Sequence, residues 1–228
     1  MDKKLKLGIF LVLFSVLSFA FSTVNLSYIV GSQQQSFTMF QFAGPVGGGI
    51  MGPGIGALSA IAVDFASKLF LGKFAWDAIS FIRLFTVAAA AVCFGMVRAK
   101  KWAGIAIPLA GMLLFWLNPV GAEAWGYAFL WLIPIVATFF ASNLFMRSLA
   151  STFQAHVVGS IAFLYLIGLP AAAWWALIPL VLVERCLFAS GMCVTYVSLN
   201  SIIALVQERF AGAGFVRVEP AYSLVRVK

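Results

Sequence analysis

The chain has 228 residues, of which 63% are hydrophobic and only 10% are charged, and this composition excludes a soluble domain of useful size. It leaves room for several membrane-crossing segments of about 20 residues each. The net charge of +8 does not indicate nucleic-acid binding, because the basic residues gather at the ends of apolar segments, as they do in membrane proteins with positive cytoplasmic loops.

Apolar segments follow one another along the chain, and we expect six to eight of them to be helices in a lipid bilayer. They occupy residues 7–30, 37–51, 55–71, 77–97, 103–118, 125–146, 152–168 and 173–207. The first is too long for the apolar part of a signal peptide and is predicted to be retained. The last would rise about 52 Å as a straight helix, so we expect a kink at Pro179 or a projecting end. The predicted fold is an all-α polytopic transmembrane helix bundle over residues 1–210, followed by a cytoplasmic C-terminal tail, residues 211–228.

The stretch 37–71 is broken by Gly52-Pro53-Gly54. Proline cannot donate a backbone hydrogen bond, and glycine unwinds a helix at low cost. These residues predict a short broken helix pair, which either crosses the membrane twice or dips in and returns. Gly52, Gly56, Ala60 and Asp64 recur every four residues, and such a stripe lets another helix approach closely.

The basic residues support this break. If residues 37–71 enter the membrane and return, eleven of the fifteen basic residues lie on the same side as both termini, and only Lys68 and Lys73 lie on the other. A single crossing would place Arg98, Lys100 and Lys101 outside. The positive-inside rule favours the first arrangement. We therefore predict a multi-pass cell-membrane protein with cytoplasmic N- and C-termini.

The same region carries a family resemblance. Thr38-Met-Phe-Gln-Phe-Ala-Gly-Pro45 and Gly52-Pro-Gly-Ile-Gly-Ala-Leu-Ser-Ala60 resemble the second and third helices of the S components of energy-coupling-factor (ECF) transporters, most closely the biotin-type members. S components are membrane subunits that capture a vitamin or metal ion for an ABC-type importer. The resemblance implies that the chain binds a small solute such as a vitamin from outside, with a T-type membrane subunit and ATPase subunits as partners. Asp2 stands where the nickel/cobalt subgroup has histidine, and the alanine-rich docking motif of the first helix is absent.

Ionisable residues inside a membrane are costly, at roughly 2.5–3.5 kcal/mol each, and need partners or a purpose. Asp64 and Arg83 are predicted to lie about 10 Å below the outer surface on consecutive antiparallel helices, and we expect them to pair. His156 and Glu184 are predicted about 17 Å deep, lining one cavity entered from outside. Arg185 follows Glu184, so the two side chains are predicted to diverge by about 100° rather than pair.

Two interpretations of these residues stay open. They form structural pairs between helices, or they line a polar cavity that binds substrate. In the second case the substrate-binding residues are Gln41, Asp64, Arg83, His156 and Glu184. The glutamines at 33–35 either add amides near the cavity mouth or form a solvated loop. Tryptophans at segment ends are interpreted as a membrane-interface belt: Trp76, Trp102, Trp125, Trp174 and Trp175.

Catalytic motifs are absent from the sequence, and we predict that the chain is not an enzyme. Ser190 and His156 resemble a Ser/His hydrolase only weakly, and one histidine with scattered carboxylates is too little for a metal site. No cofactor is expected. The predicted function is therefore the substrate-binding membrane subunit of an ECF-type importer. A non-transport membrane scaffold or assembly subunit is the alternative, and an intramembrane enzyme is the third possibility.

Overall fold

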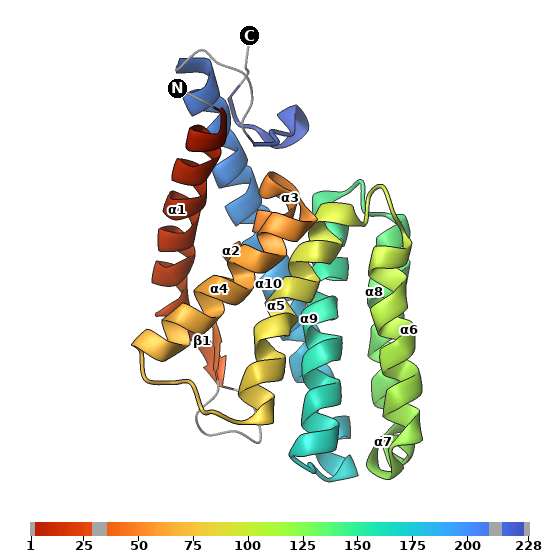
Figure 1. The fold of residues 1–228 in the computed structure, drawn as a ribbon. Helices are drawn as coiled ribbons and strands as arrows, with labels where there is room; N and C mark the ends of the chain where they lie inside the picture. The colour runs from red at the N-terminus through yellow and green to blue at the C-terminus, as the bar shows by residue number, and fades with distance from the viewer. Residues whose placement is uncertain (1–2, 29–35, 210–215, 226–228) are drawn as a thin grey trace.

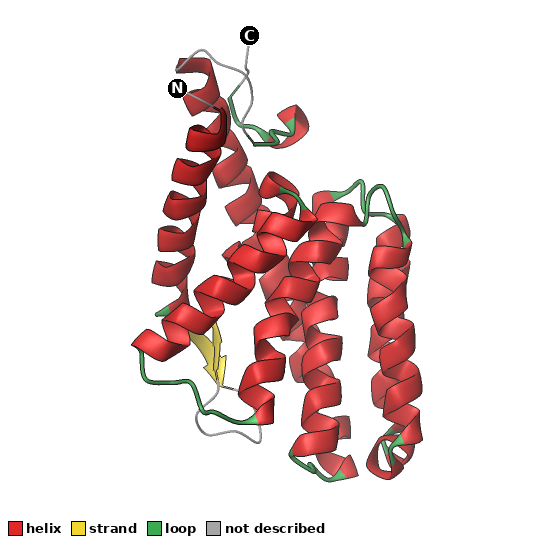
Figure 2. Cartoon of the chain, viewed as in Figure 1, coloured by secondary structure: helices red, strands yellow, loops and turns green. Residues whose placement is uncertain are grey.

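The described part of this computed structural model, residues 3–28, 36–209 and 216–225, is mostly helical (Figure 1, Figure 2). Its α-helices are, in chain order, α1 (Lys3–Ser22), α2 (Phe40–Ala43), α3 (Val46–Met51), α4 (Pro53–Phe70), α5 (Ala78–Met96), α6 (Trp102–Leu117), α7 (Pro119–Glu123), α8 (Leu132–Phe139), α9 (Leu144–Leu166) and α10 (Ala171–Arg209). The remaining elements are two short 3-10 helices and an antiparallel hairpin: η1 (Trp125–Trp131), η2 (Pro220–Tyr222), β1 (Asn25–Tyr28) and β2 (Ser36–Thr38). The predicted helix bundle is confirmed, and the hairpin is an addition to it.

Among the described residues, five helices are long and apolar enough to cross a membrane: α1, α4, α5, α9 and α10. The shorter apolar helices α6 and α8 lie side by side at the edge of the bundle (Figure 1). Large apolar side chains such as Leu58, Phe85 and Val183 point outward and are exposed, as expected where a helix surface faces lipid. These features indicate a membrane protein. The total of six to eight crossing segments stays a prediction.

Gly52 interrupts the helical backbone between α3 and α4. Its φ of 93° is a conformation that residues with a Cβ rarely adopt. Pro53 then begins α4, at the one helical position where its missing N–H costs nothing. In Figure 1, α3 reaches the end of the bundle that holds the start of α1, and α4 runs back from that end. The predicted break at Gly52-Pro53-Gly54 is confirmed, whereas the segment 37–51 before it is divided among β2, α2 and α3 rather than forming one helix.

Small residues bring α3, α4 and α5 into backbone contact. A Cβ placed on Gly48 would lie 1.8 Å from the carbonyl oxygen of Ala91 in α5, and one on Gly56 would lie 2.4 Å from the backbone nitrogen of Gly48. Ala60, one turn further along α4, is buried. This part of the predicted stripe therefore serves close helix packing.

Most of the basic residues with a described position collect at one end of the bundle. The start of α1, the connection from α5 to α6, the start of α9 and the end of α10 all lie there (Figure 1), and these segments carry Arg98, Lys101 and Arg147. Lys68 and Lys73 belong to the other end, where α4 connects to α5. This is the distribution that the positive-inside rule requires for cytoplasmic termini, and the cytoplasmic assignment itself stays a prediction.

Two predicted segments have different boundaries in the structure. The first helix ends at Ser22 rather than continuing to residue 30, because the chain turns and forms β1, whose Asn25 pairs with Thr38. The segment 125–146 is not one helix: α8 ends at Phe139, and the Asn143 side chain then caps α9 by accepting the N–H of Met146.

The last helix is long because it does not stop at its proline. α10 is 39 residues long and continues through Pro179. Its final turns project beyond the ends of α5 and α9, at the end of the molecule where α1 begins (Figure 1). The predicted projecting end is therefore observed.

The described part of the predicted tail, residues 216–225, folds back onto this end of the bundle, and we call it the C-terminal clasp. The Glu219 carboxylate accepts hydrogen bonds from Arg147 at 2.8 Å, from Tyr196 at 2.8 Å and from Arg98. The Asn200 side chain donates to the Glu219 carbonyl at 2.7 Å and accepts its N–H at 2.9 Å. Within the predicted tail these residues are therefore docked on the bundle, and Glu219 is the counter-charge of the buried Arg147.

Candidate functional site

A cavity of about 100 Å³ lies inside the bundle among α5, α9, α10, η1 and the β-hairpin. The β-hairpin, which contributes Tyr28 and Phe37 to its walls, lies in the half of the bundle away from the described ends of the chain (Figure 1). Its walls mix aromatic, aliphatic and polar side chains from these elements: Tyr28, Phe37, Gln41, Arg83, Thr86, Tyr127, Ala155, His156, Gly159, Ser160, Phe163, Leu169, Trp174, Leu177, Leu180, Val181 and Glu184. An apolar cavity with a few convergent polar groups is the usual form of a small-molecule site.

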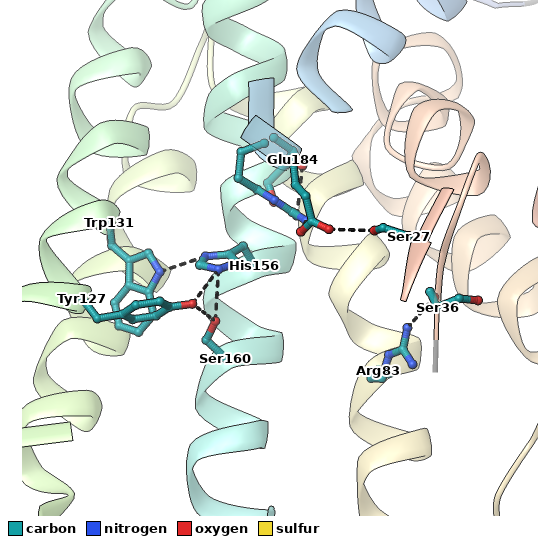
Figure 3. Close-up of polar contacts among 10 residues, drawn as sticks. Ser27, Ser36, Arg83, Tyr127, Trp131, His156, Ser160 and Glu184 are labelled. Carbon is teal, nitrogen blue, oxygen red and sulfur yellow. Dashed lines mark hydrogen bonds and ion pairs between the residues drawn. The ribbon is translucent and has the colours of Figure 1, made fainter. Parts of the chain in front are cut away.

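His156 is held by three polar side chains (Figure 3). The indole N–H of Trp131 donates to His156 Nδ1 at 3.1 Å. Because an indole nitrogen can only donate, Nδ1 must be the unprotonated nitrogen, and the ring is the neutral tautomer with its proton on Nε2. That proton faces the Tyr127 hydroxyl oxygen at 3.0 Å and Ser160 Oγ at 3.3 Å. The cavity therefore has a hydrogen-bonded wall of fixed orientation.

This tautomer bears on the enzyme interpretation. Ser160, one turn from His156 on α9, places its Oγ within hydrogen-bond distance of His156 Nε2. Ser160 is not among the candidate residues predicted from the sequence. A serine nucleophile needs an unprotonated nitrogen opposite it and an acceptor behind the other nitrogen. Here Trp131 supplies a donor behind the ring instead. The arrangement suits binding and orientation rather than proton abstraction from Ser160. Ser190, the other serine considered, donates to the Cys186 carbonyl on its own helix.

Glu184 lines another part of the same cavity. Its carboxylate accepts a hydrogen bond from Ser27 Oγ of β1 at 2.7 Å and pairs with Arg185 at 3.5 Å. The prediction that Glu184 and Arg185 do not pair is wrong, because the flexible side chains meet although their Cα–Cβ bonds diverge. His156 and Glu184 line one cavity, as predicted, but the hydrogen bonds described above join them to different partners.

Arg185 ties α10 to its neighbours. The guanidinium is fully buried and lies over the rings of Phe188 at 4.4 Å and Phe37 at 5.0 Å. It also approaches the Thr152 hydroxyl on α9 at 3.4 Å. Two aromatic faces and one carboxylate thus compensate its charge, and the approach to Thr152 joins α10 to α9.

The predicted ion pair between Asp64 and Arg83 is wrong. Asp64 pairs at 2.5 Å with Lys68, one turn along the same helix. Arg83 donates to the Ser36 carbonyl of β2 at 3.1 Å (Figure 3). An intrahelical partner four residues away is reached with less ordering than one on another helix. Asp64 and Arg83 do share a second, smaller cavity of about 50 Å³.

The five predicted site residues thus fall on two adjoining cavities. Gln41 and Arg83 line both, His156 and Glu184 line only the larger, and Asp64 lines only the smaller. The glutamines at 33–35 lie outside the described residues.

Sequence reasoning missed the aromatic part of the site. Trp174 is not in the interface belt: it is buried and packs edge-to-face on Tyr127, with ring centroids 4.9 Å apart. Its indole N–H is buried without a hydrogen-bond partner among the described residues. The neighbouring Trp175 is exposed, and so are the other three tryptophans of the predicted belt, Trp76, Trp102 and Trp125. In the sequence, only the doubled Trp174-Trp175 could have indicated that one ring faces inward, since adjacent helical residues point about 100° apart.

Comparison of the chain with protein-family models, with curated proteins and with solved structures finds no match to any of the three.

Proposed function

We propose that the chain is the solute-capturing membrane subunit of an ECF-type importer, with cytoplasmic termini and with T-type and ATPase subunits as partners. The observation that carries this proposal is the cavity between α5, α9 and α10, whose wall combines buried aromatic rings with the hydroxyl group of Tyr127, which His156 holds in place, and the carboxylate acceptor of Glu184. The family resemblance of residues 38–60 supplies the importer class.

The unpaired Trp174 N–H supports a ligand in this cavity. A buried donor without an acceptor costs about 1–3 kcal/mol, and a solute with an acceptor atom would remove that cost. The His156 wall adds rigidity, because each ring nitrogen has a partner. A site organised before the solute arrives loses less entropy on binding. The solute we propose is small, aromatic or otherwise flat, and carries both a hydrogen-bond donor for Glu184 and an acceptor.

The test is co-expression of the chain with candidate T-type and ATPase subunits, followed by affinity purification and mass spectrometry of retained small molecules. We expect the partners to co-purify and a bound solute to be recovered. Glu184→Gln keeps the shape of the side chain and the acceptor for Ser27 but removes the charge, and it is expected to lower solute retention at least about tenfold, the loss expected for a charge-assisted contact. Glu123→Gln, which neutralises an exposed glutamate outside both cavities, is the matched control.

The same experiment decides between the importer and a membrane scaffold. Co-purifying partners with no retained small molecule, and identical behaviour of Glu184→Gln and Glu123→Gln, would support the scaffold. Release of a chemically altered solute that depends on Ser160 would support an enzyme.

A further inference from the structure

The smaller cavity has a charge imbalance. Three basic side chains, Lys68, Lys73 and Arg83, line it together with one carboxylate, Asp64. Asp64 pairs with Lys68 at 2.5 Å. The cavity therefore has two more positive charges than negative ones among its described residues.

Arg83 is the centre of this imbalance. Its side chain is 9% exposed, and the one hydrogen bond described for it runs to the neutral Ser36 carbonyl. Among the described residues, no carboxylate lies within ion-pair distance of it. A guanidinium carries five N–H donors in a planar fork. Asp64 lines the same cavity but makes its ion pair with Lys68. A buried guanidinium without a carboxylate in direct contact is therefore free to pair with an added anion.

Hydroxyl groups surround the same space. Five of the lining residues carry one: Ser22, Ser36, Thr38, Ser67 and Ser80. Thr38 Oγ1 accepts the Phe40 N–H, and a hydroxyl that accepts in this way can still donate its own proton. The volume of about 50 Å³ exceeds one water, whose share of the liquid is about 30 Å³. It accommodates a group the size of a carboxylate or phosphate.

The two cavities adjoin through Arg83 and Gln41, which line both. We propose that the smaller cavity binds the carboxylate or phosphate group of a small solute whose ring occupies the larger cavity, with Arg83 as the principal anion-binding residue. This inference deepens the proposed function and rests on it for the identity of the occupant as a solute. Arg83 would contact the anion from the inner side, and the exposed Lys73 would raise the local anion concentration from the outer side.

The test uses the purified full-length protein in an uncharged detergent, titrated by calorimetry with benzoate, with benzyl alcohol as its neutral analogue, and with inorganic phosphate. We expect benzoate to bind at least about tenfold more tightly than benzyl alcohol, because a charge-assisted bidentate contact is available only to the anion. Arg83→Gln should abolish this difference. Lys100→Gln, which removes an exposed cation at the opposite end of the bundle, is the control for net charge and should leave it unchanged.

Asp64→Asn provides a test that misfolding cannot imitate. It removes the only carboxylate lining the cavity among the described residues and releases Lys68, so benzoate or phosphate should bind several-fold more tightly, with a steeper dependence on salt. Equal binding of benzoate and benzyl alcohol by the unaltered protein, or weaker anion binding by Asp64→Asn in a folded sample, would overturn the proposal.

An anionic lipid is the other source of the same chemistry. If phosphatidylglycerol in mixed micelles stabilises the protein through Arg83 while benzoate and phosphate have no effect, the cavity is a lipid site and the proposal is wrong. Failure of the importer function is distinguishable: partner subunits would then fail to co-purify while Arg83-dependent benzoate binding persisted.

Discussion

The C-terminal clasp offers the sharpest quantitative prediction, through Glu219→Ala. Arg147 is 2% exposed, and two of its guanidinium nitrogens have no hydrogen-bond partner among the described residues. Glu219 supplies its counter-charge at 2.8 Å. Removing one partner of a fully buried ion pair costs about 3–5 kcal/mol, because the other charge is left uncompensated.

Two features of the structure lower this figure. The Glu219 side chain is 24% exposed, so water reaches the pair. The Arg147 guanidinium also lies over the rings of Phe94 at 4.1 Å and Tyr196 at 4.6 Å, and these contacts persist in the variant. We therefore expect Glu219→Ala to destabilise the docked clasp by about 2–3 kcal/mol.

Hydrogen exchange measured by mass spectrometry over residues 216–225 is the assay. The N–H of Arg217 donates to the Ile50 carbonyl, and the N–H of Glu219 donates to Asn200, so both exchange only when the clasp opens. A loss of 2–3 kcal/mol should raise their exchange rates about 30- to 150-fold.

Arg98→Ala is the matched control. It removes the other arginine bonded to Glu219, and the Arg98 side chain is 48% exposed rather than buried. An exposed pair contributes about 0–1 kcal/mol. Adding Arg147→Met to Glu219→Ala should restore part of the protection, because no stranded charge remains. Equal exchange in Glu219→Ala and Arg98→Ala, or no recovery in the double variant, would refute the reasoning.

Three further changes test other parts of the structure. Burial alone would raise the pKa of Glu219, but hydrogen bonds from Arg147 and Tyr196 outweigh it and hold the pKa below its usual value of 4.5. A carboxyl group with a lowered pKa stabilises the folded state above its usual pKa. The protection of the clasp amides from hydrogen exchange should therefore be constant near neutral pH and be lost as the pH falls below 4.5. Gly48→Ala should cost at least about 2 kcal/mol in a detergent unfolding titration, because the added methyl overlaps the Ala91 carbonyl and the core cannot yield without strain; a change below 0.5 kcal/mol, the usual effect of a surface substitution, would contradict the close helix contact. Trp131→Phe leaves His156 Nδ1 without its donor and should cost about 1–3 kcal/mol, whereas no loss would mean that the indole N–H does not fix the ring.

The broken helix pair and the sorting of charges could be read from the sequence because each has a local cause. Gly52 adopts a φ of 93° that residues with a Cβ rarely reach, and Pro53 is suited to the first position of a helix. Basic side chains are excluded from lipid one residue at a time. The partner of a buried charge has no such local cause. Asp64 was predicted to meet Arg83 from matching depth, and it meets Lys68 instead, since depth alone does not fix the rotation of one helix against another.

The same limit applies to the clasp and to the aromatic wall. Charged residues interrupt the apolar ones in residues 211–228. Nothing in this pattern indicates that Glu219 would reach Arg147, 72 positions earlier in the chain. Trp174 and Trp175 are adjacent residues of the same type. Only the packing of α10 against η1 turns the Trp174 ring into the core and the Trp175 ring outward.

The sequence by itself determined that the helices lie in a lipid bilayer, that the fold is helical, that the helix breaks at Gly52 and that positive charge collects at one end. Each of these follows from apolar length, backbone chemistry or the cost of charge in lipid, which act residue by residue. Only the tertiary structure decided which polar groups face one another. Trp131 sets the tautomer of His156, and Ser27 reaches Glu184 from the hairpin. Arg83 lines two cavities, and among the described residues no carboxylate lies within ion-pair distance of it. Those relations depend on helix rotation and register, and small residues such as Gly48 set them by letting the backbones approach.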